Sequence, residues 1–215
     1  MIAHSCPTTC RGMHLHAQWK LVFNSQHSVN KMSRSEHQVL PEGVQRVQAA
    51  LQAAGHPHTP VMLDVAARTA QEAAAGLGVQ LGQIAKSVIF RGKEDGVAVL
   101  VVTSGDRRVD EKKVAALVGK VGRADADFVK AYTGFTIGGL SPLAHLYPPV
   151  TVLDQDLWHF DEVWAAAGHP HAVFRMRPED LPGLTGASAA DVVQDGPDAA
   201  MQTAKPLAPV AQEAT

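Results

Sequence analysis

The sequence predicts an α/β fold: one compact domain with a central mixed sheet surrounded by helices. First, stretches with apolar residues at three- and four-residue spacing alternate along the chain with short, β-branched apolar runs. Second, the turn at 91–96 joins two apolar runs directly, which indicates an antiparallel pair inside a sheet whose other strands alternate with helices. Third, the length of 215 residues fits one domain of about 150 residues with extensions.

The domain is expected to begin with an amphipathic helix. Pro41 precedes apolar positions Val44, Val47 and Leu51, which recur at the helical period. Gly55 follows as a C-terminal cap. This spacing predicts a helix that buries one face.

A strand at 61–65 and a second helix are expected next. Thr69 and Glu72 form a capping box that opens an Ala-rich helix ending at 76–78. The stretch 84–91 is predicted to be a strand that enters the turn at 91–96.

The run 97–103 is almost entirely β-branched, so it predicts a central strand covered on both faces. Asp110 is an N-cap for a helix in which Val114, Leu117 and Val118 are expected to face inward. The remaining predicted elements are a short helix from Asp125 or Asp127 to Gly134, a strand at 150–153, a helix at 161–167, a strand at 172–176 and a helix from Pro178.

The two ends of the chain differ from this domain, which we place at 39–193. Residues 1–38 lack periodicity, and residues 194–215 lack large apolar side chains, so both are expected to be disordered. The first stretch contains Cys6, Cys10, His14 and His16, but their spacing is a poor match to known zinc sites. We therefore expect no metal.

Composition excludes several classes of function. The hydrophobic fraction is 46% and the net charge is −2, which argues against broad electrostatic capture of nucleic acid. No apolar run is long enough for a membrane helix. Both cysteines lie in the first ten residues, so the core has no disulfide framework, and a cytoplasmic location is expected.

A glycine turn at 133–145 is the most distinctive motif. Gly138 and Gly139 permit positive φ angles and close approach of another molecule, and Pro142 stiffens the exit. Two interpretations remain open here: a loop whose backbone faces a ligand, or a tight connection with ordinary turn chemistry.

Lys86 is the second feature that suggests chemistry. On a strand it shares a face with Val88 and Phe90, and a buried ammonium needs a partner. It either lines a cleft, where it binds an anion or a carbonyl group, or extends to water from the strand end.

The hexapeptide Ala-Ala-Gly-His-Pro-His occurs twice, at 53–58 and 166–171, and each copy is expected to end a helix and lead to a strand. Glycine caps, proline stops the helix, and histidine interacts favourably with the helix dipole. A metal site or a catalytic histidine is the alternative. Sequence patterns for a serine elbow, a P-loop, a dinucleotide site or a core cysteine nucleophile do not occur.

Four stretches in this order resemble one family: residues 84–90, 99–110, 133–145 and 166–184. They are similar to the YbaK/ProX-type aminoacyl-tRNA editing domains, which include free-standing deacylases and the editing insertion of bacterial prolyl-tRNA synthetases. The resemblance covers about residues 39–193. It implies hydrolysis of the ester between a wrong amino acid and the terminal adenosine of a tRNA, without a cofactor.

The resemblance also implies roles for particular residues. Lys86, Gly138 and Gly139 would be catalytic, with the glycine backbone acting like an oxyanion hole. Arg107 and Arg108 would contact tRNA phosphates. The implied substrate-binding residues are Thr103, Ser104, Asp106, Ser141, Pro142, His145 and His171, with His169 as an alternative to His171.

The implied partner is the acceptor end of a mischarged tRNA, with prolyl-tRNA synthetase as a further partner. A small pocket would admit alanine, serine, threonine, 2-aminobutyrate or cysteine and exclude proline. The attacking water would be activated by the ribose hydroxyl of the tRNA. A non-catalytic module that binds aminoacyl-tRNA or a synthetase is the alternative function.

Overall fold

The computed structural model describes residues 40–195, which belong to the second of two units into which the chain divides, Leu40–Thr215. The expectations for residues 1–38 and for the tail beyond residue 195 lie outside the described residues. Of the predicted tail, Gln194 and Asp195 are described. The Gln194 amide donates to the Arg108 carbonyl at 2.8 Å, and Asp195 pairs with Lys113 at 2.8 Å.

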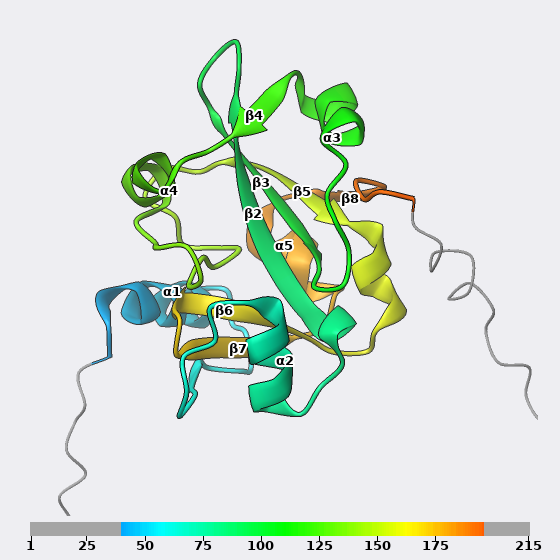
Figure 1. Ribbon diagram of the computed structural model, residues 1–215. Coiled ribbons are helices and arrows are strands. Elements are labelled where there is room, and N and C mark those ends of the chain that lie inside the picture. Colours follow the sequence, from blue (N-terminus) through cyan, green and yellow to red (C-terminus); the bar gives the residue numbers. More distant parts are fainter. Residues whose placement is uncertain (1–39, 196–215) are drawn as a thin grey trace, which may run out of the picture. The chain divides into compact units, whose positions relative to one another are not determined.

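Eight strands of the described residues form one sheet in the order β1-β7-β6-β2-β3-β5-β8, with β4 paired to β2 (Figure 1). The β2–β6, β3–β5 and β5–β8 pairs are parallel and the other pairs are antiparallel. The mixed sheet is therefore confirmed. The strands are β1 (Val61–Met62), β2 (Ile84–Gly92), β3 (Ala98–Ser104), β4 (Val121–Arg123), β5 (Val150–Asp154), β6 (Val163–His169), β7 (Ala172–Met176) and β8 (Ser188–Ala190).

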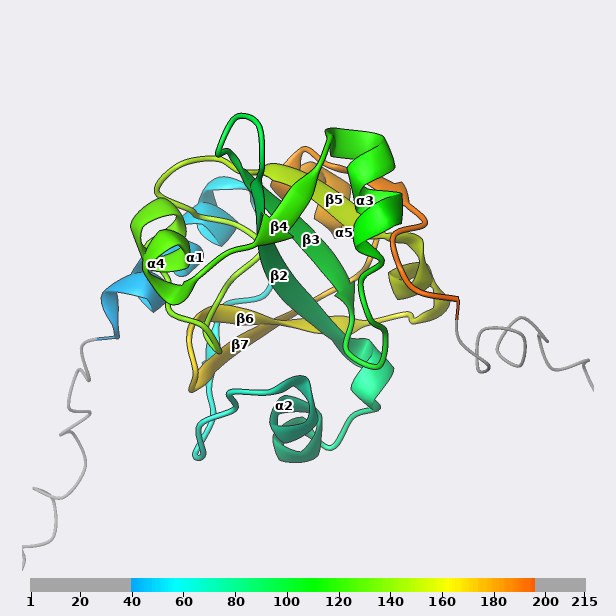
Figure 2. The ribbon, with the colours of Figure 1, turned by 45° about the horizontal axis from the view of Figure 1, so that its top comes forward.

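Helices cover both faces of the sheet (Figure 2). Residues of α1, α4 and α5 pack in the largest buried cluster, α3 packs with β4 in a second, and α2 packs against the start of β2 in a third. The α-helices are α1 (Glu42–Ala53), α2 (Ala70–Leu77), α3 (Glu111–Val118), α4 (Ala126–Thr133) and α5 (Asp180–Thr185), and Leu81–Gln83 and Gln155–His159 are short 3-10 helices.

Local capping chemistry sets most helix ends. The Thr69–Glu72 capping box is present at α2, and the Asp110 carboxylate accepts from two amides at α3. Asp125, not Asp127, caps α4. The inward orientation expected for Leu117 is wrong, because its side chain is 54% exposed.

The helix predicted at 161–167 is wrong, because this segment is strand β6. Val163, Ala165 and Ala167 are buried and the residues between them are partly exposed, which is the two-residue period of a strand. Alanine's helix propensity is a weak prior that pairing with β7 and β2 overrides here.

Other strands also differ in extent from the expectations. The strand expected at 61–65 covers only Val61–Met62, and β4 and β8 were not predicted. The strand expected at 97–103 is present as β3, and all of its residues are buried, as its continuous apolar run predicted.

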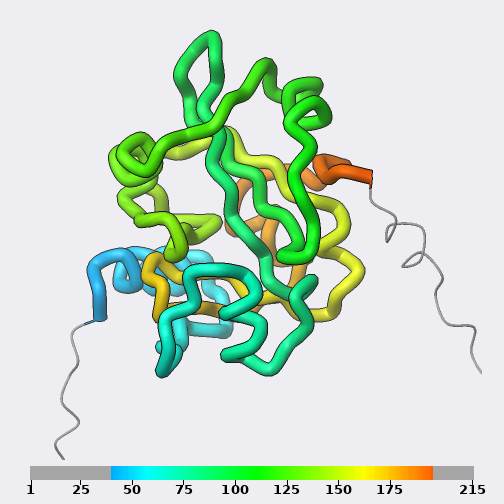
Figure 3. The backbone as a smooth tube through the Cα atoms, in the orientation of Figure 1, coloured from blue at the N-terminus to red at the C-terminus, as the bar shows by residue number. Residues whose placement is uncertain are grey.

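The sheet has a discontinuity between β2 and β6. Their parallel pairing covers only Ile84–Trp164 and Ala85–Ala165. Beyond these pairs β2 continues along β3, whereas β6 pairs with β7. The turn after α4 runs into the region between β2 and β6 (Figure 3). No helix among the described residues is long and apolar enough to cross a membrane.

Candidate functional site

A cavity of about 370 Å³ lies where β2 and β6 diverge. Its walls come from the start of α2, the first half of β2, the glycine turn, β6 and the β6–β7 turn. The lining residues are Ala67–Gln71, Ala73, Ile84–Val88, Gly105, Ile137, Gly138, Leu140, Trp164–Ala166, Pro170, Ala172 and Val173. None of them is an Asp, Glu, His or Cys, so the wall contains no carboxylate or imidazole base and no thiol.

Lys86 lines this cavity, as the cleft interpretation predicted. Its ammonium donates to the Arg107 carbonyl at 2.7 Å and lies 3.5 Å from the Gly105 carbonyl. Burial lowers the pKa of Lys86, while nearby Asp106 opposes the shift. The backbone at 105–107 thus holds the amine in a fixed place beside the cavity.

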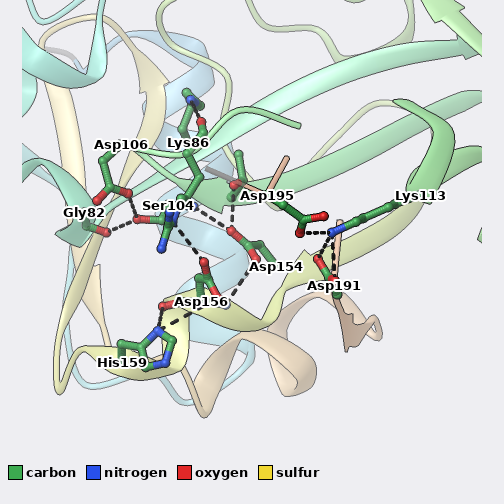
Figure 4. A network of polar contacts seen from close by, with 12 residues as sticks. Gly82, Lys86, Ser104, Asp106, Lys113, Asp154, Asp156, His159, Asp191 and Asp195 are labelled. Carbon is green, nitrogen blue, oxygen red and sulfur yellow. Dashed lines mark hydrogen bonds and ion pairs between the residues drawn. The ribbon is translucent and has the colours of Figure 1, made fainter. Parts of the chain in front are cut away.

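Thr103, Ser104 and Asp106 belong to one polar network. Figure 4 shows Ser104, Asp106 and Asp154 of this network. The Thr103 hydroxyl donates to buried Asp154 at 2.7 Å, and the Ser104 hydroxyl lies 2.7 Å from both the Gly82 carbonyl and an Asp106 oxygen. Burial raises the pKa of Asp154. None of these side chains lines the cavity, so their contacts position the loop that holds Lys86.

The two glycines of the turn have different surroundings. Gly138 lines the cavity with φ +90°, and a Cβ there would lie 3.3 Å from the Cα of Arg68. A Cβ at Gly139 would lie 2.8–2.9 Å from backbone atoms of His169. The Gly139 amide also donates to the Thr136 carbonyl at 3.0 Å. Gly138 therefore faces the cavity, while Gly139 allows close packing of the turn on β6.

Ser141, Pro142 and His145 fix the exit of the turn and do not line the cavity. The His145 ring bonds to the Ser141 carbonyl at 2.8 Å and meets the Phe135 ring edge-on. Burial lowers the pKa of His145. The fixed φ of Pro142 and these contacts stiffen the turn.

The two arginines have different environments. Arg107 pairs with Asp156 at 3.0 Å, and its side chain is 10% exposed. Arg108 is exposed, and its carbonyl accepts from Gln194. Arg108 is thus the more accessible of the two to a phosphate.

The second hexapeptide lies beside the cavity, which its Pro170 lines. The His171 ring stacks on His169 and bonds to the Leu63 carbonyl at 3.1 Å. The Pro170 carbonyl accepts from the Ala67 amide at 2.8 Å. These bonds attach the segment before α2 to the β6–β7 turn. No group of three potential metal ligands occurs among the described residues.

Sequence reasoning missed several polar residues of the cavity wall, among them Ser87 and Trp164. The Ser87 hydroxyl and the Trp164 indole N–H are buried and have no hydrogen-bond partner in the described part of the chain. The only signal for Ser87 is its place next to Lys86, on the opposite face of the strand. Trp164 lies in the segment wrongly predicted to be a helix, so its position beside β2 did not follow from the sequence.

Comparisons with known proteins identify the family of this chain. The family model described as "Aminoacyl-tRNA editing domain" matches residues 64–184. The chain is 34% identical over 119 residues to "Uncharacterized protein YwhH" of Bacillus subtilis, covering 55% of this chain and 75% of that protein. It is 28% identical over 126 residues to "Putative Cys-tRNA(Pro)/Cys-tRNA(Cys) deacylase EbsC" of Enterococcus faecalis, covering 58% of this chain and 76% of that protein.

A solved structure is similar along its whole length. It is called "a putative trans-editing enzyme for prolyl tRNA synthetase", and it shares 43% sequence identity with this chain at a TM-score of 0.68. The match covers 73% of this chain and 99% of that one. The fold and the order of its elements are therefore those of a known structural class.

Proposed function

Because the chain belongs to the aminoacyl-tRNA editing domain family, we propose that it hydrolyses mischarged tRNA in trans, removing a small amino acid from tRNA for proline. The observation that supports this most is the cavity at the β2–β6 divergence, where Lys86 and Gly138 line one space. The names of the similar proteins favour the proline tRNA and prolyl-tRNA synthetase as partners.

Lys86 supplies a half-buried positive charge at the proposed site, whose wall also includes the exposed Arg68. An ammonium has three donors, and two of them face the carbonyls of Arg107 and Gly105. The remaining donor is available to the terminal ribose or to the carbonyl oxygen of the ester. A charge held by the protein before substrate binds stabilises developing negative charge without reorganisation.

Gly138 is the better of the two glycines for an oxyanion role. The Gly139 amide is used inside the turn, whereas Gly138 lines the cavity in a conformation that other residues rarely adopt. We propose that the backbone at Gly138 contacts the ester, and that Gly139, Ser141, Pro142 and His145 hold the turn in place.

The absence of Asp, Glu, His and Cys side chains from the described cavity wall shapes the mechanism. Water would attack the ester carbonyl, with the ribose hydroxyl of the tRNA assisting removal of its proton. Arg108 would contact a phosphate, while Arg107 positions the loop through Asp156. The composition of the cavity wall also favours a second candidate function, a module that binds aminoacyl-tRNA without turnover.

Deacylation assays decide between the two candidates. Alanyl-, seryl- and cysteinyl-tRNA for proline are incubated with the protein, and loss of the ester is measured. Hydrolysis above the buffer rate is the expected result. Binding without hydrolysis of any of these substrates would favour the non-catalytic module.

The Lys86→Met variant tests the residue itself. Loss of a charge that stabilises the transition state should lower kcat about 10²–10³-fold. Folding stability should change little, because the loss of the hydrogen bonds to the Arg107 and Gly105 carbonyls is offset by relief of the burial that disfavours the ammonium. Lys112→Met, on the exposed face of α3, is the matched control and should retain activity. Full activity in Lys86→Met would remove Lys86 from the mechanism.

Gly138→Val is the companion test of the turn. It should abolish hydrolysis, because the side chain would enter the cavity wall beside Arg68 and force an unfavourable φ. Gly139→Val is not equivalent, since its side chain would collide with the backbone of His169 and unfold the turn. Circular dichroism of both variants separates loss of the site from loss of the fold.

A further inference from the structure

Ser87 carries a buried hydroxyl that no described contact explains. The hydroxyl has no hydrogen-bond partner among residues 40–195, although the residue lines the cavity. Buried polar side chains in native proteins nearly always have a partner, and an unpaired one costs free energy. Such a group inside a binding cavity is explained if a ligand supplies the missing partner.

The position of Ser87 indicates which part of a ligand it meets. Successive strand residues point to opposite faces, so Ser87 shares a face with Ala85 and Ile89, away from Lys86. Ala85, Ala165 and Leu140 belong to the main buried core and also line the cavity. This side of the cavity is therefore closed by the core.

A tRNA can enter such a cavity in one direction only. Its terminal adenosine is attached to the rest of the polynucleotide, so the nucleoside must stay toward the open side. The amino acid side chain is then the part that reaches the closed side, next to Ser87. This step rests on the function proposed above.

We propose that Ser87 is a specificity-determining residue that binds the side-chain hydroxyl of a small aminoacyl group, so that the site prefers serine to alanine. Rotation about the Cα–Cβ bond of Ser87 toward the cavity breaks no hydrogen bond, because none is made. A seryl group provides the missing partner, whereas an alanyl group leaves the hydroxyl unpaired.

Trp164 provides a second, independent reason to expect a polar ligand. Its indole N–H is also unpaired and buried, and the residue lines the same cavity. An indole N–H is only a donor, so its partner must be an acceptor. Because Trp164 pairs with Ile84, it lies on the Lys86 face of the sheet, where the ester oxygens of an aminoacyl group can accept from it but the ammonium cannot.

The expected preference follows from the asymmetry of hydrogen bonding. A site with a buried polar group strongly rejects a substrate analogue that leaves this group without a hydrogen-bond partner. An apolar pocket rejects a substrate with one additional hydroxyl only weakly. For a single neutral hydrogen bond, kcat/KM should be about tenfold higher for seryl- than for alanyl-tRNA on the same tRNA.

The test compares these two substrates for the wild-type chain and for Ser87→Ala. In the variant the preference for serine should disappear through a tenfold loss with seryl-tRNA, while the rate with alanyl-tRNA stays within about twofold. Thermal unfolding should show Ser87→Ala to be at least as stable as wild type, because the lost hydroxyl was unpaired. Ser188→Ala, exposed on β8, is the matched control and should keep the wild-type ratio.

Two results would overturn the inference: a wild-type preference for alanine, or an equal loss with both substrates in Ser87→Ala. If Ser87→Ala does not fold, the wild-type ratio decides the question. Binding of non-hydrolysable amide-linked seryl- and alanyl-adenosine gives a readout that does not need catalysis. Tighter binding of the seryl analogue without any hydrolysis would contradict the proposed enzyme activity and support the role of Ser87.

Discussion

The hexapeptide Ala-Ala-Gly-His-Pro-His follows a helix in one place and forms a strand and turn in the other. At 53–58 it ends α1, where the His56 amide donates to the Leu51 carbonyl at 2.9 Å. At 166–171 it contains a bulge of β6 and the turn into β7. Identical residues thus adopt two structures, and the surrounding chain decides which one forms.

The glycines show the difference most clearly. Both have positive φ, +68° at Gly55 and +86° at Gly168. A Cβ at Gly55 would have no atom within 4 Å, whereas a Cβ at Gly168 would lie 2.5 Å from the Gly43 carbonyl oxygen and 2.8 Å from the Phe135 ring. Gly55 is needed only for its positive φ angle. Gly168 has a positive φ angle and also allows α1 to pack closely on β6.

The largest difference between the two copies is expected in the free energy of unfolding of the variants Gly168→Ala and Gly55→Ala. Gly168→Ala should lose more than about 3 kcal/mol of unfolding free energy, because backbone strain and collision with Gly43 add together. Gly55→Ala should lose about 1 kcal/mol from its left-handed conformation alone. Urea unfolding of both variants measures the difference. Equal losses would mean that packing around the second copy is no tighter than around the first.

The histidines give the next largest contrast. His171→Ala removes the bond to the Leu63 carbonyl and loosens the segment before the cavity wall at Ala67. KM for deacylation should rise about fivefold with little change in kcat, as expected for the loss of one hydrogen bond. His58→Ala, at the corresponding place in the first copy, should change neither KM nor kcat. A fall in kcat for His171→Ala with unchanged KM would instead place this histidine in the chemistry.

The smallest effect is expected from mild acid. The pKa of buried His145 is lowered, so its stabilising contribution is complete above the ordinary value of 6.5 and is lost as the pH falls below it. Because His145 holds the turn that packs Gly139 on His169, acid should loosen the second copy and leave the first unchanged. The loss should be smaller than that of Gly55→Ala.

Hydrogen exchange at pH 7.5 and 5.5, corrected for intrinsic rates, checks this expectation. Amides at 136–146 should lose protection at the lower pH, and those at 50–58 should not. His145→Gln should abolish the difference. Equal loss of protection in both segments would assign the acid effect to groups other than His145.

The sequence predicted the fold where local signals and burial agree. Capping by Thr69 and Asp110 sets helix starts through bonds between near neighbours, and the apolar run of β3 requires cover on both faces. The helix prediction for segment 161–167 was wrong because alanine fits a helix locally. The alternating burial of Val163, Ala165 and Ala167 depends on strands that are distant in sequence.

The site was predicted in part for the same reason. A lysine on an apolar strand and paired glycines are unusual patterns in themselves, and Lys86 and Gly138 both line the cavity. The bond of Thr103 to Asp154 and the ion pair of Arg107 with Asp156 join distant segments. No local sequence pattern predicts these contacts or the unpaired hydroxyl of Ser87.

The short pairing between β2 and β6 has a consequence for how such a site can change over time. Neighbouring residues of β2 reach the cavity from opposite faces of the sheet, with Lys86 on one and Ser87 on the other. Substitution at one position need not disturb its neighbour. With the roles proposed for Lys86 and Ser87, reactivity and substrate choice could then evolve, or be engineered, as nearly independent traits within a single strand.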